Sequence, residues 1–154
     1  MRNFMNAINK YRRARWCYTH RLGILAKLIE MEIYLVHNSF IPASSELGEG
    51  TLFGYKGIGV VIHKRARVGR NCLIAQQVTI GGRSGHYEVP IIGDNCEICA
   101  GAKVLGPVHI GNNVTIGANA VMICDAPDNT VWAGVPAKCI QSKIGSLTTG
   151  MGSR

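Results

Sequence analysis

The chain has 154 residues, the length of one domain, and 47% of them are hydrophobic, enough to form a packed core. It has no run of about 18 apolar residues and no apolar stretch behind its basic N-terminus, so we expect neither a transmembrane helix nor a signal peptide, and a cytoplasmic location. The formal net charge is +8, but no zinc finger, helix-turn-helix or aromatic stacking platform accompanies it, which argues against a nucleic-acid partner.

Residues 1–40 are predicted to form a helical segment. Between residue 3 and about residue 37, apolar side chains recur at helical spacing, and Gly23 marks the point where two helices could meet. Basic residues crowd the first half, which leaves two interpretations. The segment either packs as a helical cap on the rest of the chain or on a neighbouring subunit, or it also touches an anionic membrane surface. The residues that would make the membrane contact are Arg12, Arg13, Arg15 and Trp16.

A repeat of six residues dominates residues 41–141. An aliphatic side chain returns at every sixth position, with a small or apolar residue two positions before it. Neither an α-helix nor a strand has this period, which is the signature of a parallel β-helix. Each hexad forms one flat side of a triangular coil, and the aliphatic residue points inward. The inward residues are Ile62, Val68, Ile74 and Ile80, followed by Ile92, Ile98, Val104, Ile110, Ile116 and Met122.

The repeat is interrupted twice. The inward residue after Phe53 comes nine positions later, at Ile62, across a segment with three glycines. A second gap separates Ile80 from Ile92, where residues 81–90 are polar and glycine-rich and His86 occupies the position that should point inward. We expect a loop there that leaves the coil. Because a regular repeat specifies a fold and no activity, function is expected at the two interruptions.

Two further predictions concern metal sites and the C-terminus. Cys72 and Cys96 fall on inward positions and are expected to be small core residues. Cys96 and Cys99 form a single Cys-x-x-Cys pair, without a second pair or a histidine at ligand spacing, so no metal site is predicted. Residues 142–154 are mostly small and polar and are predicted to form a flexible tail.

Three segments, taken in order, resemble the hexapeptide-repeat acyltransferases, and within them the serine acetyltransferase-like branch. They are residues 74–82 (IAQQVTIGG), 90–95 (PIIGDN) and 133–138 (AGVPAK). The resemblance implies a left-handed parallel β-helix and a homotrimer with active sites between adjacent subunits. It also implies acetyl-CoA as the donor, a histidine as general base on the acceptor hydroxyl, and direct transfer without a metal or an acyl-enzyme.

Departures from that branch shape the predicted acceptor. Serine acetyltransferases carry an Asp-His pair before a Gly-Ile-Val-Val segment, and here the matching positions are Gly54 and Tyr55. The second active-site histidine of the family falls near Val89, with His86 the closest candidate. We therefore expect an O-acetyltransferase that acts on a sugar hydroxyl in surface polysaccharide biosynthesis. The alternatives are a serine O-acetyltransferase of cysteine biosynthesis and a non-catalytic trimeric scaffold.

Two histidines at the interruptions are the catalytic candidates. A neutral imidazole can deprotonate a hydroxyl near pH 7. His63, directly after the first interruption, is predicted to be this base, with His86 as the alternative base or as an acceptor-binding residue. Tyr55 and Glu88 are predicted to contact the acceptor. Backbone N–H groups that could stabilise the oxyanion are those around Gly81, Gly82 and Gly101.

The donor acetyl-CoA is expected to lie along the stacked coils. Its pantetheine arm would bond to exposed backbone at the corners, and lysine side chains would meet its phosphates. The residues predicted to contact it are Gly81, Gly82, Gly101, Ala102, Lys103, Gly117, Ala118, Gly134 and Lys138.

Overall fold

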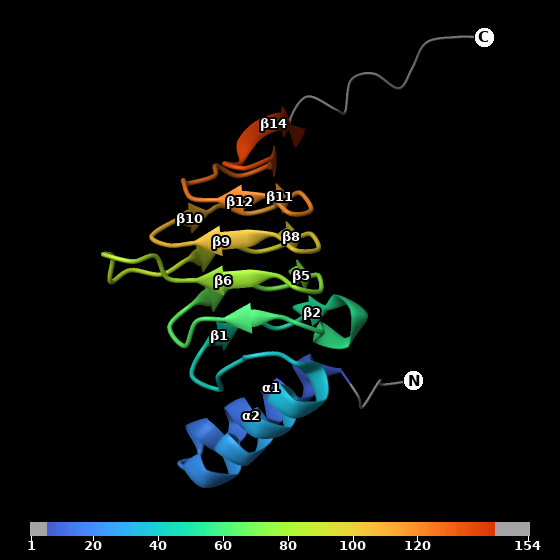
Figure 1. Ribbon diagram of the computed structural model, residues 1–154, viewed down its shortest axis with the longest axis vertical. Coiled ribbons are helices and arrows are strands. Elements are labelled where there is room, and N and C mark those ends of the chain that lie inside the picture. Colours follow the sequence, from blue (N-terminus) through green and yellow to red (C-terminus); the bar gives the residue numbers. More distant parts are fainter. Residues whose placement is uncertain (1–5, 144–154) are drawn as a thin grey trace, which may run out of the picture.

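Two helices stand at one end of a β solenoid in the computed structural model, which describes residues 6–143 (Figure 1). Helix α1 (Ala7–Thr19) begins after Asn6, whose side chain accepts a hydrogen bond from the Ile8 N–H. Helix α2 (Gly23–His37) is capped at its C-terminus by Asn38, which adopts the left-handed conformation. Two helices are therefore present where the sequence predicts them, and they meet just before Gly23.

Helix α1 is hydrogen-bonded to the first coil of the solenoid. The Tyr11 hydroxyl donates to the backbone oxygen of Ser45 at 2.6 Å and accepts from the Leu47 N–H at 3.3 Å. The guanidinium groups of Arg12 and Arg15 donate to backbone oxygens within residues 43–51. Helix α1 therefore packs as a cap on the end of the solenoid.

Helix α2 turns an apolar face away from α1 and the solenoid. The exposed side chains recur at helical spacing and are Ile24, Leu28, Met31 and Leu35. No helix within residues 6–143 is long and apolar enough to cross a membrane.

The solenoid is built from short strands that stack into three sheets. The sheet orders are β1-β4-β7-β10, β14-β13-β11-β8-β5-β2 and β12-β9-β6-β3, and every described pair is parallel except β13 with β14. Within residues 46–122, strands that neighbour one another in a sheet lie one coil apart in the sequence, so the predicted left-handed parallel β-helix is confirmed. The bounds are β1 (Glu46–Leu47), β2 (Leu52–Phe53), β3 (Val61–Ile62), β4 (Arg67–Val68), β5 (Leu73–Ile74), β6 (Thr79–Gly81), β7 (Ile91–Ile92), β8 (Glu97–Ile98), β9 (Lys103–Leu105), β10 (His109–Ile110), β11 (Thr115–Ile116), β12 (Val121–Met122), β13 (Thr130–Ala133) and β14 (Lys138–Ser142).

The inward residues of the hexads form the core. Along the β3-β6-β9-β12 sheet the stacked side chains are Ile62, Ile80, Val104 and Met122, all of them fully buried. A single coil cannot bury its own apolar side, so each coil is stabilised by the coils above and below it.

Both interruptions of the repeat lie at corners of the coils. The first contains a short turn, η1 (Gly54–Gly57), between β2 and β3. The second is a loop, residues 82–90, between β6 and β7, and residues 82–88 of it are exposed. His86 lies exposed in this loop, and β7 begins directly after Pro90. The insertions therefore leave the stacking of the flat sides intact.

The cysteine and C-terminal predictions have different outcomes. Cys72 and Cys96 are buried in the core, as predicted. Ser142 is the last residue of β14, and the ammonium group of Lys143 donates to the backbone oxygen of Asn113 at 2.8 Å. The first two residues of the predicted tail thus contact the solenoid, and residues 144–154 lie outside the described residues.

Candidate functional site

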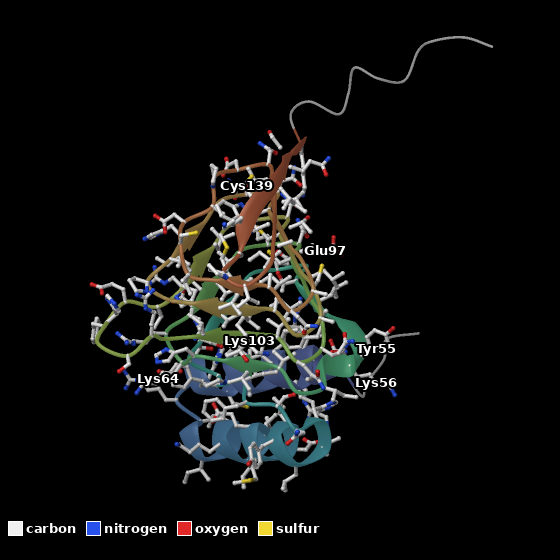
Figure 2. All side chains as sticks on the ribbon, turned by 45° about the horizontal axis from the view of Figure 1, so that its top comes forward. Tyr55, Lys56, Lys64, Glu97, Lys103 and Cys139 are labelled. Carbon is white, nitrogen blue, oxygen red and sulfur yellow. The ribbon has the colours of Figure 1, made fainter. Side chains whose placement is uncertain are left out.

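The predicted site residues fall into two groups at opposite ends of the β12-β9-β6-β3 sheet. The loop corner, residues 63–66 and 82–90, follows β3 and β6 and carries His63 and His86. The opposite corner, residues 54–59, 99–102 and 117–120, precedes β3, β9 and β12 and carries Tyr55. Figure 2 shows the separation, with Lys64 near one edge and Tyr55 and Lys56 near the other.

His63 has a fixed orientation at the loop corner. Its backbone N–H donates to the Ile80 oxygen at 2.8 Å, and its Nδ1 accepts from the Arg65 N–H at 3.1 Å. The ring lies near Gly82, because a Cβ added to that glycine would be 3.9 Å from His63 Cδ2. Burial, followed by the charges of Arg65 and Lys64, lowers the pKa of His63 below its ordinary value of 6.5, so the imidazole is neutral at about pH 7.

The lowered pKa of His63 makes the stability of the fold depend on pH. The folded state binds this proton more weakly than the unfolded chain. The stabilising contribution of His63 is therefore present above about pH 6.5 and is lost as the pH falls through the lowered pKa. Between about pH 8 and about pH 5, we expect the wild type to lose free energy of unfolding relative to His63→Gln. Urea titrations at each pH measure this difference, and a difference that does not change with pH would contradict the lowered pKa.

Arg65 holds the loop beside His63. Its guanidinium group donates to the backbone oxygen of Tyr87 and lies over the Tyr87 ring, with Cζ 3.8 Å from the ring centroid. His86 and Glu88 flank Tyr87 and are both exposed. The contact therefore keeps the second candidate histidine at the corner that carries the first. Sequence reasoning missed Arg65, because no periodicity links it to a tyrosine 22 positions away.

Tyr55 and Lys56 are conspicuous at the opposite corner because both have left-handed backbone angles, with φ of 47° and 61°. Residues other than glycine avoid this conformation unless their surroundings hold it. Gly57, which follows, is buried, and its backbone oxygen accepts a hydrogen bond from the Ser39 hydroxyl. Tyr55 is 76% exposed and Lys56 is exposed as well. This corner presents a phenol and an ammonium group to solvent. Sequence reasoning missed Lys56, because the left-handed backbone conformation that distinguishes it is visible only in the structure.

The oxyanion candidates divide between the two corners. Gly81 is the last residue of β6, and Gly82 begins the loop beside His63. Gly101 lies at the opposite corner, and its N–H already donates to the Gln76 oxygen at 3.0 Å. The glycines near the candidate histidines are therefore Gly81 and Gly82.

Some of the residues predicted to contact the pantetheine arm already bond or pack within the solenoid. The Gly117 N–H donates to the Trp132 oxygen at 2.7 Å, and Ala102 is buried. Ala118 is exposed at the same corner. Most of the ladder N–H groups here bond to the next coil, so a ligand arm along this corner would rely on the remaining backbone oxygens and on side chains.

Two lysines predicted to meet phosphates lie near the opposite corner. The Lys103 ammonium group donates to the Gln77 oxygen at 2.8 Å and keeps donors for a ligand, since an ammonium group carries three. Lys138 begins β14 and is exposed, and Gly134 is exposed after β13. Residues 6–143 contain no group of three or more His, Cys, Asp or Glu side chains that could hold a metal ion.

The other described histidines lie outside both corners. His20 stacks on Trp16 with ring centroids 4.2 Å apart, His37 is buried at the end of α2, and His109 is exposed on β10. The imidazoles at the loop corner are therefore His63 and His86.

Comparison with known proteins places this arrangement in a family. The model of the bacterial transferase hexapeptide family (six repeats) matches residues 90–124. A serine acetyltransferase from Synechococcus elongatus is 39% identical over 133 residues, which cover 84% of this chain and 54% of the relative. A serine acetyltransferase from Staphylococcus epidermidis is 33% identical over 141 residues, which cover 90% of this chain and 66% of the relative. The chain belongs to the hexapeptide-repeat acyltransferases, in their serine acetyltransferase-like branch.

A solved structure of a serine acetyltransferase shows that the similarity extends to the three-dimensional fold. Serine acetyltransferase from Brucella abortus in complex with coenzyme A is 30% identical, with a TM-score of 0.83 over 88% of this chain and 55% of that chain. The chain spans about half the length of the first relatives that it matches.

These relatives correct one prediction. Along 80–90% of this chain they are named serine acetyltransferases, so the prediction of a sugar O-acetyltransferase of surface polysaccharide biosynthesis is wrong. The prediction relied on departures at a few positions, among them the absence of an Asp-His pair at Gly54 and Tyr55, whereas the similarity extends along most of the chain.

Proposed function

We propose that this chain is an acetyl-CoA-dependent serine O-acetyltransferase of cysteine biosynthesis that acts in the cytoplasm. The observation that carries the proposal is the similarity to serine acetyltransferases along most of the chain. The relatives in complex with CoA support acetyl-CoA as the donor. The imidazoles at the loop corner support chemistry on a hydroxyl group.

The reaction needs one proton acceptor and one hydrogen-bond donor. The serine oxygen forms a bond to the thioester carbon while its proton moves to an imidazole, and the C–S bond then breaks as the sulfur takes a proton. Between these events the former carbonyl oxygen is negatively charged and must be stabilised. His63 and His86 are the proposed catalytic residues, and Tyr55 and Glu88 the proposed contacts to serine.

We include a homotrimer in the proposal, because the two proposed contacts to serine, Tyr55 and Glu88, lie at different corners of one chain. The loop corner, which carries Glu88, and the opposite corner, which carries Tyr55, lie at different ends of one sheet (Figure 2). In a closed threefold ring, the loop corner of each chain can lie beside the opposite corner of the next. Acetyl-CoA would then bind between chains, with its phosphates near Lys103 and Lys138.

Product identification tests the proposal. The full chain is incubated with acetyl-CoA and L-serine, and O-acetyl-L-serine is detected by mass spectrometry. L-alanine is the matched control, since it differs from serine by the absence of the hydroxyl group. We expect an acetylated product with L-serine and none with L-alanine. If a protein shown to be folded forms no O-acetyl-L-serine, the proposal is refuted.

A further inference from the structure

The hydrogen bond between the Arg65 N–H and His63 Nδ1 determines where the neutral ring carries its proton. Because Nδ1 accepts this bond at 3.1 Å, it holds a lone pair, and the proton of the neutral imidazole lies on Nε2. If Nδ1 carried the proton, its N–H would point at the Arg65 N–H, and two hydrogen-bond donors would face each other. His63 therefore offers a hydrogen-bond donor to a ligand and has no free lone pair with which to accept a proton at Nε2.

The local structure keeps the Arg65 N–H in this position. The Ala66 N–H donates to the His63 oxygen at 2.9 Å and closes a turn, and the Ala66 side chain is buried in the core. The Arg65 side chain is bound to Tyr87 on the loop. The donor on Nε2 is thus a consequence of how the corner folds.

We propose that His63 donates a hydrogen bond through Nε2–H to the thioester oxygen as it becomes negative, and that His86 takes the serine proton. This inference rests on the proposed function. As the serine oxygen bonds to the thioester carbon, the C=O electron pair moves to the oxygen and the proton passes to His86. When the C–S bond breaks, the carbonyl re-forms and His86 returns the proton to the sulfur, giving CoA and O-acetylserine.

The base role falls to His86 because it is the other imidazole at the loop corner. Its side chain is exposed in the loop, and the loop is held beside His63 through the contact between Arg65 and Tyr87. A neutral imidazole without a fixed hydrogen bond on one nitrogen can keep either lone pair available to a hydroxyl proton. The corner therefore supplies a donor with a fixed tautomer and a separate proton acceptor.

Substitution by the two amides separates a donor from a base. The amide nitrogen of glutamine reaches about as far as Nε2, whereas that of asparagine reaches only as far as Nδ1, and neither amide can act as a base at neutral pH. We expect His63→Ala and His63→Asn to lower kcat by about 10²–10³-fold and His63→Gln to lower it by about tenfold or less. His109→Gln is the matched control, because His109 is exposed on β10 and lies outside both corners. If the wild type is active and His63→Gln loses as much activity as His63→Ala, the donor role of His63 is overturned.

Nitrogen-15 NMR of the imidazole reads the tautomer directly, whether or not the protein turns over substrate. At about pH 8, we expect His63 to carry its proton on Nε2. A proton on Nδ1 would overturn the donor role while leaving the proposed function intact. Failure of the wild type to acetylate L-serine would overturn the proposed function, and the donor role with it. An Nε2–H tautomer together with activity in His63→Gln is the result that the inference predicts.

Discussion

His86→Ala is expected to lower kcat for acetyl transfer to L-serine by about 10²–10⁴-fold, because the variant lacks the group that takes the serine proton. His86 lies exposed in the 82–90 loop, so its loss leaves no cavity in the core. The KM for acetyl-CoA should change little, since the proposed phosphate contacts are lysines near the opposite corner. Steady-state kinetics with each substrate varied in turn measure both quantities.

Added imidazole distinguishes a lost base from a displaced loop. A small base that diffuses into the vacated space should restore part of the activity of His86→Ala, while Tyr87→Ala, which removes the ring from the Arg65 contact, should gain nothing from it. His109→Ala is the control for the loss of an exposed histidine elsewhere. If the kcat of His86→Ala stays within about threefold of the wild type, His86 is not the base.

Ile98→Ala is expected to lower the free energy of unfolding by about 2–5 kcal/mol, the range for large-to-small substitutions in a packed core. Ile98 is fully buried on β8. It pairs with Ile74 on one side and with Ile116 on the other, so the alanine leaves a cavity between two coils. Urea denaturation followed by circular dichroism measures the change.

Two matched variants show whether the loss of free energy of unfolding comes from the inward position of Ile98. Ile98→Val keeps most of the side chain and should cost about 0.5–1.5 kcal/mol. Glu97→Ala changes the exposed neighbour on the same strand and should stay within about 0.5 kcal/mol of the wild type. An Ile98→Ala variant as stable as Glu97→Ala would contradict the stacked core.

The fold could be predicted from the sequence because the solenoid is a one-dimensional repeat. A period of six fixes which residues point inward, and the parallel register that pairs Ile62 with Ile80 follows from it. The loop at 82–90 could be predicted for the same reason, since polar residues cannot fill a flat side. The inward register and the loop both follow from the order of residues along the chain, which the six-residue period makes readable.

The arrangement of the site could be predicted only in part. His63 and His86 could be selected because they stand at the interruptions. The contact of Arg65 with Tyr87 could not be foreseen, because it joins two segments of the loop corner through a side chain and follows no periodicity. The same limit applies to the tautomer of His63, which depends on one backbone N–H within its own turn.

Release of CoA thiol from acetyl-CoA, followed with and without L-serine, tests the central claim most directly. We expect thiol release that depends on L-serine, saturates with both substrates and falls by about 10²-fold or more in His86→Ala. Thiol release that L-serine does not increase, from a protein shown to be folded, would contradict it.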